Sequence, residues 1–202
     1  MDLIFKLARR INQIFFRLVE RGELLHKKNY CLLSEGAHLY PSSKIENNQA
    51  RREAIVVAAG SQILGQLLVL AHGGSIRIGE SCFVGEHSRI WSADSITIGN
   101  RVLISHNVNI HDYNAHSLSA QSRSHHFKEI FSNGHPTNLE DVASAPIVID
   151  DDAWIGFNST ILKGVRIGKG AIVGAATLVT KDVPDYAIVA GIPAKIIGDA
   201  RP

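Results

Sequence analysis

Histidines gather in one stretch of this 202-residue chain, between residues 111 and 146. The stretch holds His111, His116, His125, His126 and His135, with Asp112, Tyr113 and Arg123 among them. Imidazole titrates near neutral pH, so a histidine can accept a proton from a nucleophile and release it in each catalytic cycle. Three histidines can instead hold a zinc ion that activates water. We therefore expect the chemistry of this protein to lie in this stretch.

A strict six-residue period lies on both sides of the histidine-rich stretch. After it, the aliphatic anchors are Ile149, Ile155, Ile161, Ile167, Val173 and Val179. A helix repeats its apolar positions near 3.6 residues and a strand near 2. A period of six with interspersed glycines instead indicates a β-solenoid of hexapeptides. Three hexapeptides make one triangular coil, and the coils must stack because one coil cannot bury its own apolar face.

The same period runs from Ile78 to Ile110 with one two-residue slip, stops at His111 and returns at Ile147. Residues 111–146 are therefore predicted to be a long loop extruded from the stack, and such loops are usually functional or disordered. Gly156, Gly168 and Gly174 directly follow three anchors, where we expect positive φ in the turns. The domain assignment is a helical segment at 1–35, the solenoid at 36–198 and a tail at 199–202.

Residues 2–21 are predicted to form an amphipathic helix, because apolar side chains recur at three- and four-residue spacing. Asp2 is a candidate cap, and Gly22 is a candidate end. Residues 1–28 carry seven basic and three acidic side chains, so their net charge is +7 − 3 = +4. Such a helix can lie on an anionic lipid surface. Packing on the solenoid or on a neighbouring subunit is the commoner fate of an amphipathic helix, and we favour it.

The composition narrows the class of protein. A net charge of +2 does not favour nucleic-acid binding. No apolar run reaches the roughly 20 residues of a membrane span. Cys31 and Cys82 match no metal-site spacing, and the chain has no secretory pattern. We therefore expect reduced thiols in a cytoplasmic protein, peripheral at the inner membrane face if the first helix binds lipid.

Four motifs carry a resemblance to a known family: DAWIG at 152–156, KGVRIG at 163–168, TKDVP at 180–184 and AGIPAK at 190–195. Over residues 75–198 the chain resembles the left-handed β-helix acyltransferases of the hexapeptide-repeat family. Within that family it is most similar to the sugar O-acetyltransferases, which include the galactoside and maltose enzymes and those that modify capsule and lipopolysaccharide. The first 35 residues do not resemble the galactoside and maltose enzymes, which favours the polysaccharide-modifying branch.

The resemblance implies an all-β solenoid, a left-handed parallel β-helix, that assembles as a homotrimer. It implies transfer of acetyl from acetyl-CoA to a sugar hydroxyl, with surface polysaccharide as the expected context (O-antigen, capsule or exopolysaccharide). A histidine base acts within a ternary complex, and neither a metal nor a covalent enzyme intermediate is implied.

The catalytic residue is implied by a short loop motif of the family, a histidine followed by an aliphatic residue and later an arginine. Residues 115–118, with Arg123 beyond, match this motif, so His116 is the implied base. His111 stays an alternative base, and Asp112 is a candidate to orient the imidazole. The candidate acceptor contacts are Trp91, Tyr113 and Arg123.

The residues that match the family's coenzyme A contacts are Trp154, Gly156, Ala175, Thr180, Lys181, Pro193 and Lys195. Phe157 stands where the galactoside enzymes have a serine, which leaves only a backbone amide to face the thioester. Lys195 replaces an arginine, so a bidentate phosphate contact is lost there. Gly85 and Ser92 stand where the galactoside enzymes bind their acceptor, so a simple galactoside or maltose is not expected.

Three alternatives stay open. The first is an N-acetyltransferase acting on an amino sugar or an antibiotic. The second is a zinc-dependent carbonic anhydrase of the γ type, with His111 and His116 five residues apart and His72 or His87 as the third ligand. The third is a non-catalytic scaffold, which would bind no coenzyme A.

Overall fold

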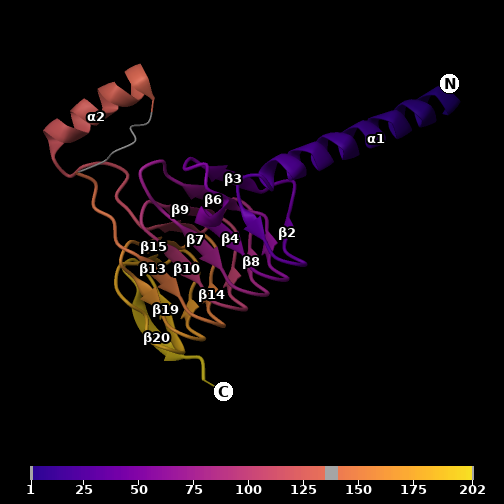
Figure 1. The fold of residues 1–202 in the computed structure, drawn as a ribbon. Coiled ribbons are helices and arrows are strands. Elements are labelled where there is room, and N and C mark those ends of the chain that lie inside the picture. The colour runs from indigo at the N-terminus through magenta and orange to yellow at the C-terminus, as the bar shows by residue number, and fades with distance from the viewer. Residues whose placement is uncertain (1, 135–140, 202) are drawn as a thin grey trace.

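The computed structural model describes residues 2–134 and 141–201, so His135 lies outside the described residues. Three sheets wind into one solenoid (Figure 1). Sheet A contains β1 (Leu32–Leu33), β4 (Ile55–Val57), β7 (Ile76–Ile78), β10 (Ile96–Ile98), β13 (Ile147–Ile149) and β16 (Arg166–Ile167). Sheet B contains β2 (His38–Leu39), β5 (Gln62–Ile63), β8 (Phe83–Val84), β11 (Leu103–Ile104), β14 (Trp154–Ile155), β17 (Ile172–Val173), β19 (Ala187–Ala190) and β20 (Lys195–Asp199). Sheet C contains β3 (Lys44–Asn47), β6 (Gln66–Val69), β9 (Arg89–Ser92), β12 (Asn109–His111), β15 (Thr160–Leu162) and β18 (Leu178–Val179).

The predicted anchors form the core of this solenoid. All pairings are parallel except that of β19 with β20, and each anchor lies over its counterpart one coil away. Ile104 pairs with Ile155 and Ile110 with Ile161, across the long loop, and all four are buried. Truncating one such isoleucine to alanine leaves a cavity that costs about 2–5 kcal/mol of stability. The hexapeptide solenoid is therefore confirmed.

The positive φ predicted for Gly156, Gly168 and Gly174 is wrong. Positive φ occurs instead at the non-glycine residues Asp152, Asn158 and Ala176 of the same coils. The glycines are required because neighbouring coils approach closely there. A Cβ on Gly156 would lie 2.7 Å from the backbone nitrogen of Ala175, and one on Gly168 would lie 2.5 Å from that of Asp185.

The first helix, α1 (Asp2–Lys27), runs through Gly22, so the predicted end at that glycine is wrong. Contacts further along hold the last turns in place. Leu24 packs against the core, and the Lys27 ammonium donates to the carbonyls of Tyr40 at 3.2 Å and Pro41 at 2.9 Å. These contacts offset the helix penalty of one glycine, about 1 kcal/mol. The rest of α1 projects away from the solenoid (Figure 1).

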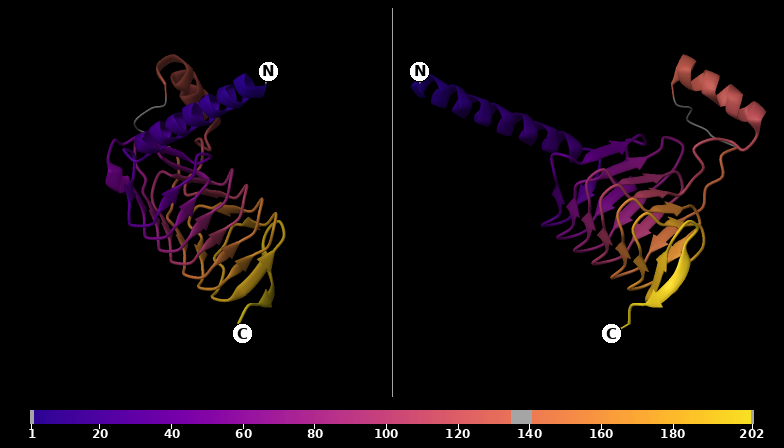
Figure 2. Two further views of the ribbon diagram at one scale, coloured as in Figure 1. Left: turned by 90° about the vertical axis from the view of Figure 1, so that its right-hand side faces the viewer. Right: turned by 180° about the vertical axis from the view of Figure 1, so that it is seen from behind.

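The long loop between β12 and β13 contains a second helix, α2 (Ala120–Asn133). Ser119 caps it by accepting from the Ser122 amide, and Gly134 ends it with φ 83°. A short 3-10 helix, η1 (Arg52–Ala54), precedes β4. In both views of Figure 2, α1 and α2 lie on the same side of the solenoid, away from the C-terminus.

Candidate functional site

The base of the long loop is closed by backbone pairing between its two ends. The Asn114 amide donates to the Ala143 carbonyl at 2.9 Å, and the Ala145 amide donates to the Asp112 carbonyl at 2.8 Å. Beyond this pairing, the Ser117 hydroxyl donates to the Asp141 carboxylate at 3.1 Å. The backbone on both sides of His116 is thereby held, although its side chain is exposed.

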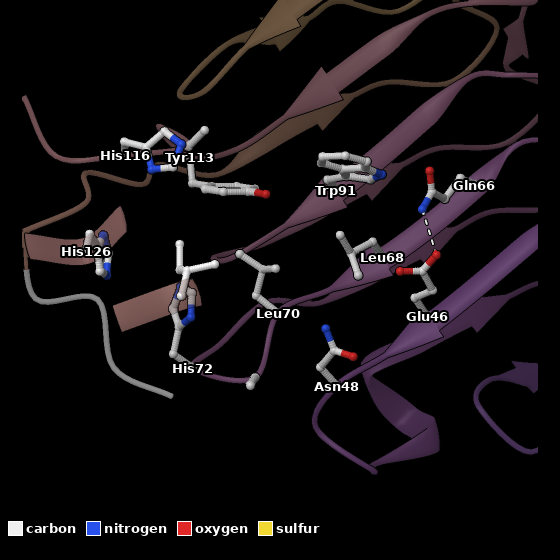
Figure 3. A pocket seen from close by; sticks show the side chains of 13 residues that line it. Glu46, Asn48, Gln66, Leu68, Leu70, His72, Trp91, Tyr113, His116 and His126 are labelled. Atoms are coloured by element: carbon white, nitrogen blue, oxygen red, sulfur yellow. Dashed lines mark hydrogen bonds between the residues drawn. The ribbon is translucent and has the colours of Figure 1, made fainter. Parts of the chain in front are cut away.

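A cavity of about 420 Å³ lies between this loop and the outer face of sheet C. His116, Tyr113 and Trp91 line it, so the structure brings together the implied base and two of the three candidate acceptor contacts (Figure 3). On the solenoid side, Gln66 donates to the Glu46 carboxylate at 2.9 Å. The cavity therefore combines aromatic faces, hydrogen-bonding groups and an imidazole, which together suit a polar ring such as a sugar.

Two further histidines line the same cavity, and the sequence did not assign them to it. His72 follows β6, and His126 lies on α2 (Figure 3). Burial lowers the pKa of His72, and the nearby His126 lowers it further. Part of this lining could have been predicted from the strand register of sheet C. Leu68, Trp91 and His111 occupy equivalent positions in successive coils. The α2 contribution depends on how the loop folds, which no six-residue period encodes.

His111 lies on the outer face of sheet C in a row of aromatic rings. Its ring stacks on Trp91 with centroids 4.8 Å apart, and its centroid lies 6.2 Å from that of the Tyr113 ring. Its Nε2 is buried without a hydrogen-bond partner among the described residues. Burial, and secondarily the positive charge of Arg89, lowers the pKa of His111 to about 4. A group with this pKa is a weak proton acceptor at neutral pH, which favours His116 as the base.

This shift predicts a pH dependence of stability. An unfolded histidine binds a proton near pH 6.5, whereas folded His111 binds one near pH 4. Acidification from 6.5 to 4 therefore protonates the unfolded state first and lowers the free energy of unfolding, by at most about 2 kcal/mol after solvent screening. We expect His111→Phe, which keeps the ring stack, to reduce this loss in urea unfolding measured across that pH range. An identical pH slope in wild type and variant would contradict the assignment.

Asp112 is buried and makes its hydrogen bonds within one turn of the preceding coil. Its carboxylate accepts from the Ser92 hydroxyl at 2.6 Å and from the amides of Ala93 at 2.7 Å and Asp94 at 3.1 Å. Burial raises the pKa of Asp112, and these hydrogen bonds oppose the rise. The described contacts thus tie Asp112 to the turn at 92–94, and none of them reaches the His116 imidazole.

Arg123, the third candidate acceptor contact, does not line the cavity. Its guanidinium donates to the Ser117 carbonyl at 2.9 Å and to the Leu118 carbonyl at 3.3 Å. It therefore braces the backbone that directly follows His116.

On the cofactor side, Trp154 stands on the outer face of sheet B with 49% of its surface exposed. Its indole nitrogen donates to the Ser105 hydroxyl at 3.4 Å. Ser105 also lines a second cavity, of about 430 Å³, together with His106. The His106 ring stacks on Phe157 at 5.3 Å. An exposed indole beside an open cavity suits a ligand with an aromatic or extended arm.

The remaining candidate cofactor residues lie in the last coils. Gly156 and Ala175 occupy one corner in successive coils. Thr180, Lys181, Pro193 and Lys195 are all exposed. The Ala194 amide donates to the Leu178 carbonyl at 2.8 Å, which places the segment of Pro193 and Lys195 beside the end of sheet C. An exposed ammonium at Lys181 is suited to a phosphate.

The two groups of candidate residues lie on different faces of one chain. His116 opens onto sheet C, whereas Trp154 belongs to sheet B. None of the candidate cofactor residues lines the His116 cavity.

Over residues 2–134 and 141–201, no group of three or more His, Cys, Asp or Glu is arranged to hold a metal ion. His72 and His116 line the same cavity, whereas His111 stacks with the rings of Trp91 and Tyr113 and does not line that cavity.

Two family profiles match the solenoid on either side of the long loop. "Hexapeptide repeat of succinyl-transferase" covers residues 75–111, and "Bacterial transferase hexapeptide (six repeats)" covers residues 146–181. A 2,3,4,5-tetrahydropyridine-2,6-dicarboxylate N-acetyltransferase of Staphylococcus aureus (strain JH9) is 55% identical over 62 residues. That match covers 31% of this chain and 26% of the relative, so this chain matches only about a quarter of the relative's length.

Solved structures share the fold over most of the chain. A mutant of AntD, an N-acyltransferase from Bacillus cereus in complex with dTDP-4-amino-4,6-dideoxyglucose and coenzyme A, has a TM-score of 0.69 at 17% identity, covering 90% of both chains. A hexapeptide-repeat-containing acetyltransferase from Vibrio cholerae has a TM-score of 0.58 at 26% identity, covering 91% of this chain and 81% of its own. A structure of that acetyltransferase complexed with acetyl-CoA matches with a TM-score of 0.59 at 24% identity.

These findings confirm the left-handed β-helix fold. They also show hexapeptide repeats of the transferase type over residues 75–111 and 146–181. They do not confirm the sugar O-acetyltransferase type, because the relatives named above include N-acyltransferases. No helix among the described residues is both long and apolar enough to cross a membrane.

Proposed function

We propose that this protein transfers an acetyl group from acetyl-CoA to a sugar, with an amino group as the first candidate acceptor and a hydroxyl as the second. The observation that carries the proposal is the cavity of about 420 Å³ that His116, Tyr113 and Trp91 line together. The fold and the hexapeptide repeats support the acyltransferase class.

In the proposed reaction, the acceptor ring lies against Trp91 and Tyr113, with its nucleophile toward His116. Bound acetyl-CoA supplies the thioester carbonyl that is attacked. The His116 imidazole takes the proton from the acceptor and later returns it to the departing thiol, so the enzyme ends each cycle unchanged. Arg123 holds the carbonyls of Ser117 and Leu118, and thereby limits the movement of the loop that carries the base.

The residues fit coenzyme A on three counts. Trp154 presents a half-exposed indole beside the second cavity. The Phe157 amide, which follows the corner Gly156, is the proposed donor to the thioester carbonyl oxygen, as in an oxyanion hole. Lys181 is an exposed cation for the phosphates. These assignments do not depend on the identity of the acceptor.

Because His116 and Trp154 lie on different faces, a complete site needs a second copy of the chain. We propose a homotrimer in which the loop of one subunit meets the cofactor face of its neighbour. Closed homo-oligomers of this kind build sites from two surfaces of the same chain.

Two observations bear on whether the acceptor is an amine or a hydroxyl, and they point in opposite directions. N-acyl transfer is the activity of the Staphylococcus relative and of AntD, whose complex holds an amino sugar nucleotide. The loop motif at 115–118 and Arg123 resemble the O-acetyltransferases instead. An alcohol needs a base to become a nucleophile, whereas the neutral form of an amine already is one.

The experiment is a thiol-release assay with acetyl-CoA and matched sugar pairs that carry an amine or a hydroxyl at the same carbon. We expect the amino sugar nucleotide to react at least roughly tenfold faster than its hydroxyl analogue, because a site adapted to one hydrogen-bonding group discriminates against the other. Turnover with the hydroxyl analogue alone would make the protein an O-acetyltransferase. The absence of thiol release with any sugar would overturn the proposal.

A further inference from the structure

The apolar side of α1 is uncovered. Phe5, Ile11, Ile14, Phe15 and Leu18 are 57–70% exposed, although all are large hydrophobic residues. Ile11, Ile14, Phe15 and Leu18 follow three- and four-residue spacing, so they share one helix face. We name Ile11, Ile14, Phe15 and Leu18 the apolar strip. A strip of this size on an isolated helix marks an interaction surface.

Arginines border the apolar strip. Arg10 precedes Ile14 by four residues and Arg21 follows Leu18 by three, so both lie at the edge of the strip. Arg9, Arg10 and Arg21 are exposed. A long arginine side chain at such an edge can extend its guanidinium toward phosphate while its methylenes stay in apolar surroundings.

The strip is also placed away from the rest of the chain. The contacts to the solenoid that the described residues of α1 make come from its last turns, through Leu24 and Lys27. The helix then projects outward, and α2 lies on the same side of the solenoid (Figure 2). Phe127 and Phe131 of α2 are 60% and 77% exposed. Both helices that project from the solenoid therefore carry exposed aromatic side chains.

We propose that α1 is an interfacial helix that docks this protein on an anionic lipid surface. Aromatic and aliphatic side chains on one face and basic side chains on the other are the pattern of helices that lie in the headgroup region. The excess of positive charge in residues 1–28, +7 − 3 = +4, complements anionic headgroups. The same excess opposes the alternative occupant, a second copy of α1, since parallel copies would bring Arg10 and Arg21 close to their own counterparts.

The test is co-sedimentation of the 202-residue protein with vesicles of pure phosphatidylcholine or of phosphatidylcholine mixed with phosphatidylglycerol. We expect partitioning to be at least roughly tenfold stronger on the anionic vesicles at low salt and weaker at ~0.5 M salt, where charge attraction is screened. The double variant Ile14→Glu/Leu18→Glu places two carboxylates in the apolar strip and is expected to abolish binding.

The matched control is Asn12→Glu/Gln13→Glu, which adds the same charge at exposed positions outside the strip. We expect it to keep most of the vesicle binding, with a loss no larger than a few-fold. An equal loss of vesicle binding in the two variants would mean that only the net charge of α1 matters, and it would overturn docking through the apolar strip. Failure of the wild type to bind anionic vesicles would also overturn the proposal. If the Ile14→Glu/Leu18→Glu variant then formed a smaller oligomer than wild type in gel filtration, α1 would be assigned to contacts between copies of the chain. Thermal unfolding of both variants checks that the solenoid remains folded as in the wild type.

Discussion

Replacing His116 by alanine is expected to lower kcat for a hydroxyl acceptor by roughly 10²–10⁴-fold, the usual contribution of a general base. The side chain is exposed, so its removal leaves no cavity in the solenoid core. Thiol release at saturating acetyl-CoA measures the loss. For an amine acceptor we expect a smaller loss that shrinks as the pH rises, because more of the amine is then neutral without help from the base.

The matched control is His125→Ala. His125 is also an exposed loop histidine, but it lies on α2, faces Glu129 at 3.5 Å and does not line the cavity. It should retain kcat within about twofold, as surface substitutions usually do. An unchanged kcat in His116→Ala would move the base to another imidazole, and the His111→Gln variant would then be tested with the same assay.

The solenoid could be predicted because every coil must bury its anchor residues in the same way. Each anchor such as Ile155 is buried by the anchors one coil before and after it, and this requirement appears directly as a period of six. The corner glycines were predicted at the right positions for the wrong reason. A sequence shows that Gly156 follows an anchor. That a Cβ at this position would lie 2.7 Å from the Ala175 nitrogen becomes evident only when the coils are stacked.

The site was less predictable because the loop follows no period. Trp91 and Tyr113 come together with His116 since the loop leaves and re-enters the stack at one corner. The sequence alone did not show whether the Asp112 carboxylate contacts a histidine or a turn of the preceding coil. The structure shows that it accepts three hydrogen bonds from residues 92–94. His126 reaches the cavity from α2, a helix with a weak apolar period.

A site shared between subunits makes a second large effect testable. Two variants are needed, His116→Ala and Trp154→Ala/Lys181→Ala. The second is expected to lose roughly 10–100-fold in kcat/KM at low acetyl-CoA, because a half-exposed aromatic contact and a phosphate cation are removed together. Each variant alone assembles into oligomers in which every site is defective.

Co-expression of the two variants with different affinity tags, followed by tandem purification, yields mixed oligomers. In a cyclic trimer that contains both variants, about one site in three joins an intact loop of one subunit to an intact cofactor face of its neighbour. Mixed trimers are therefore expected to recover up to about a third of wild-type activity. Co-expressed copies of His116→Ala that differ only in their tags are the control. If the site lay within one chain, every site would keep one defect, so mixed oligomers without recovered activity would refute the shared site.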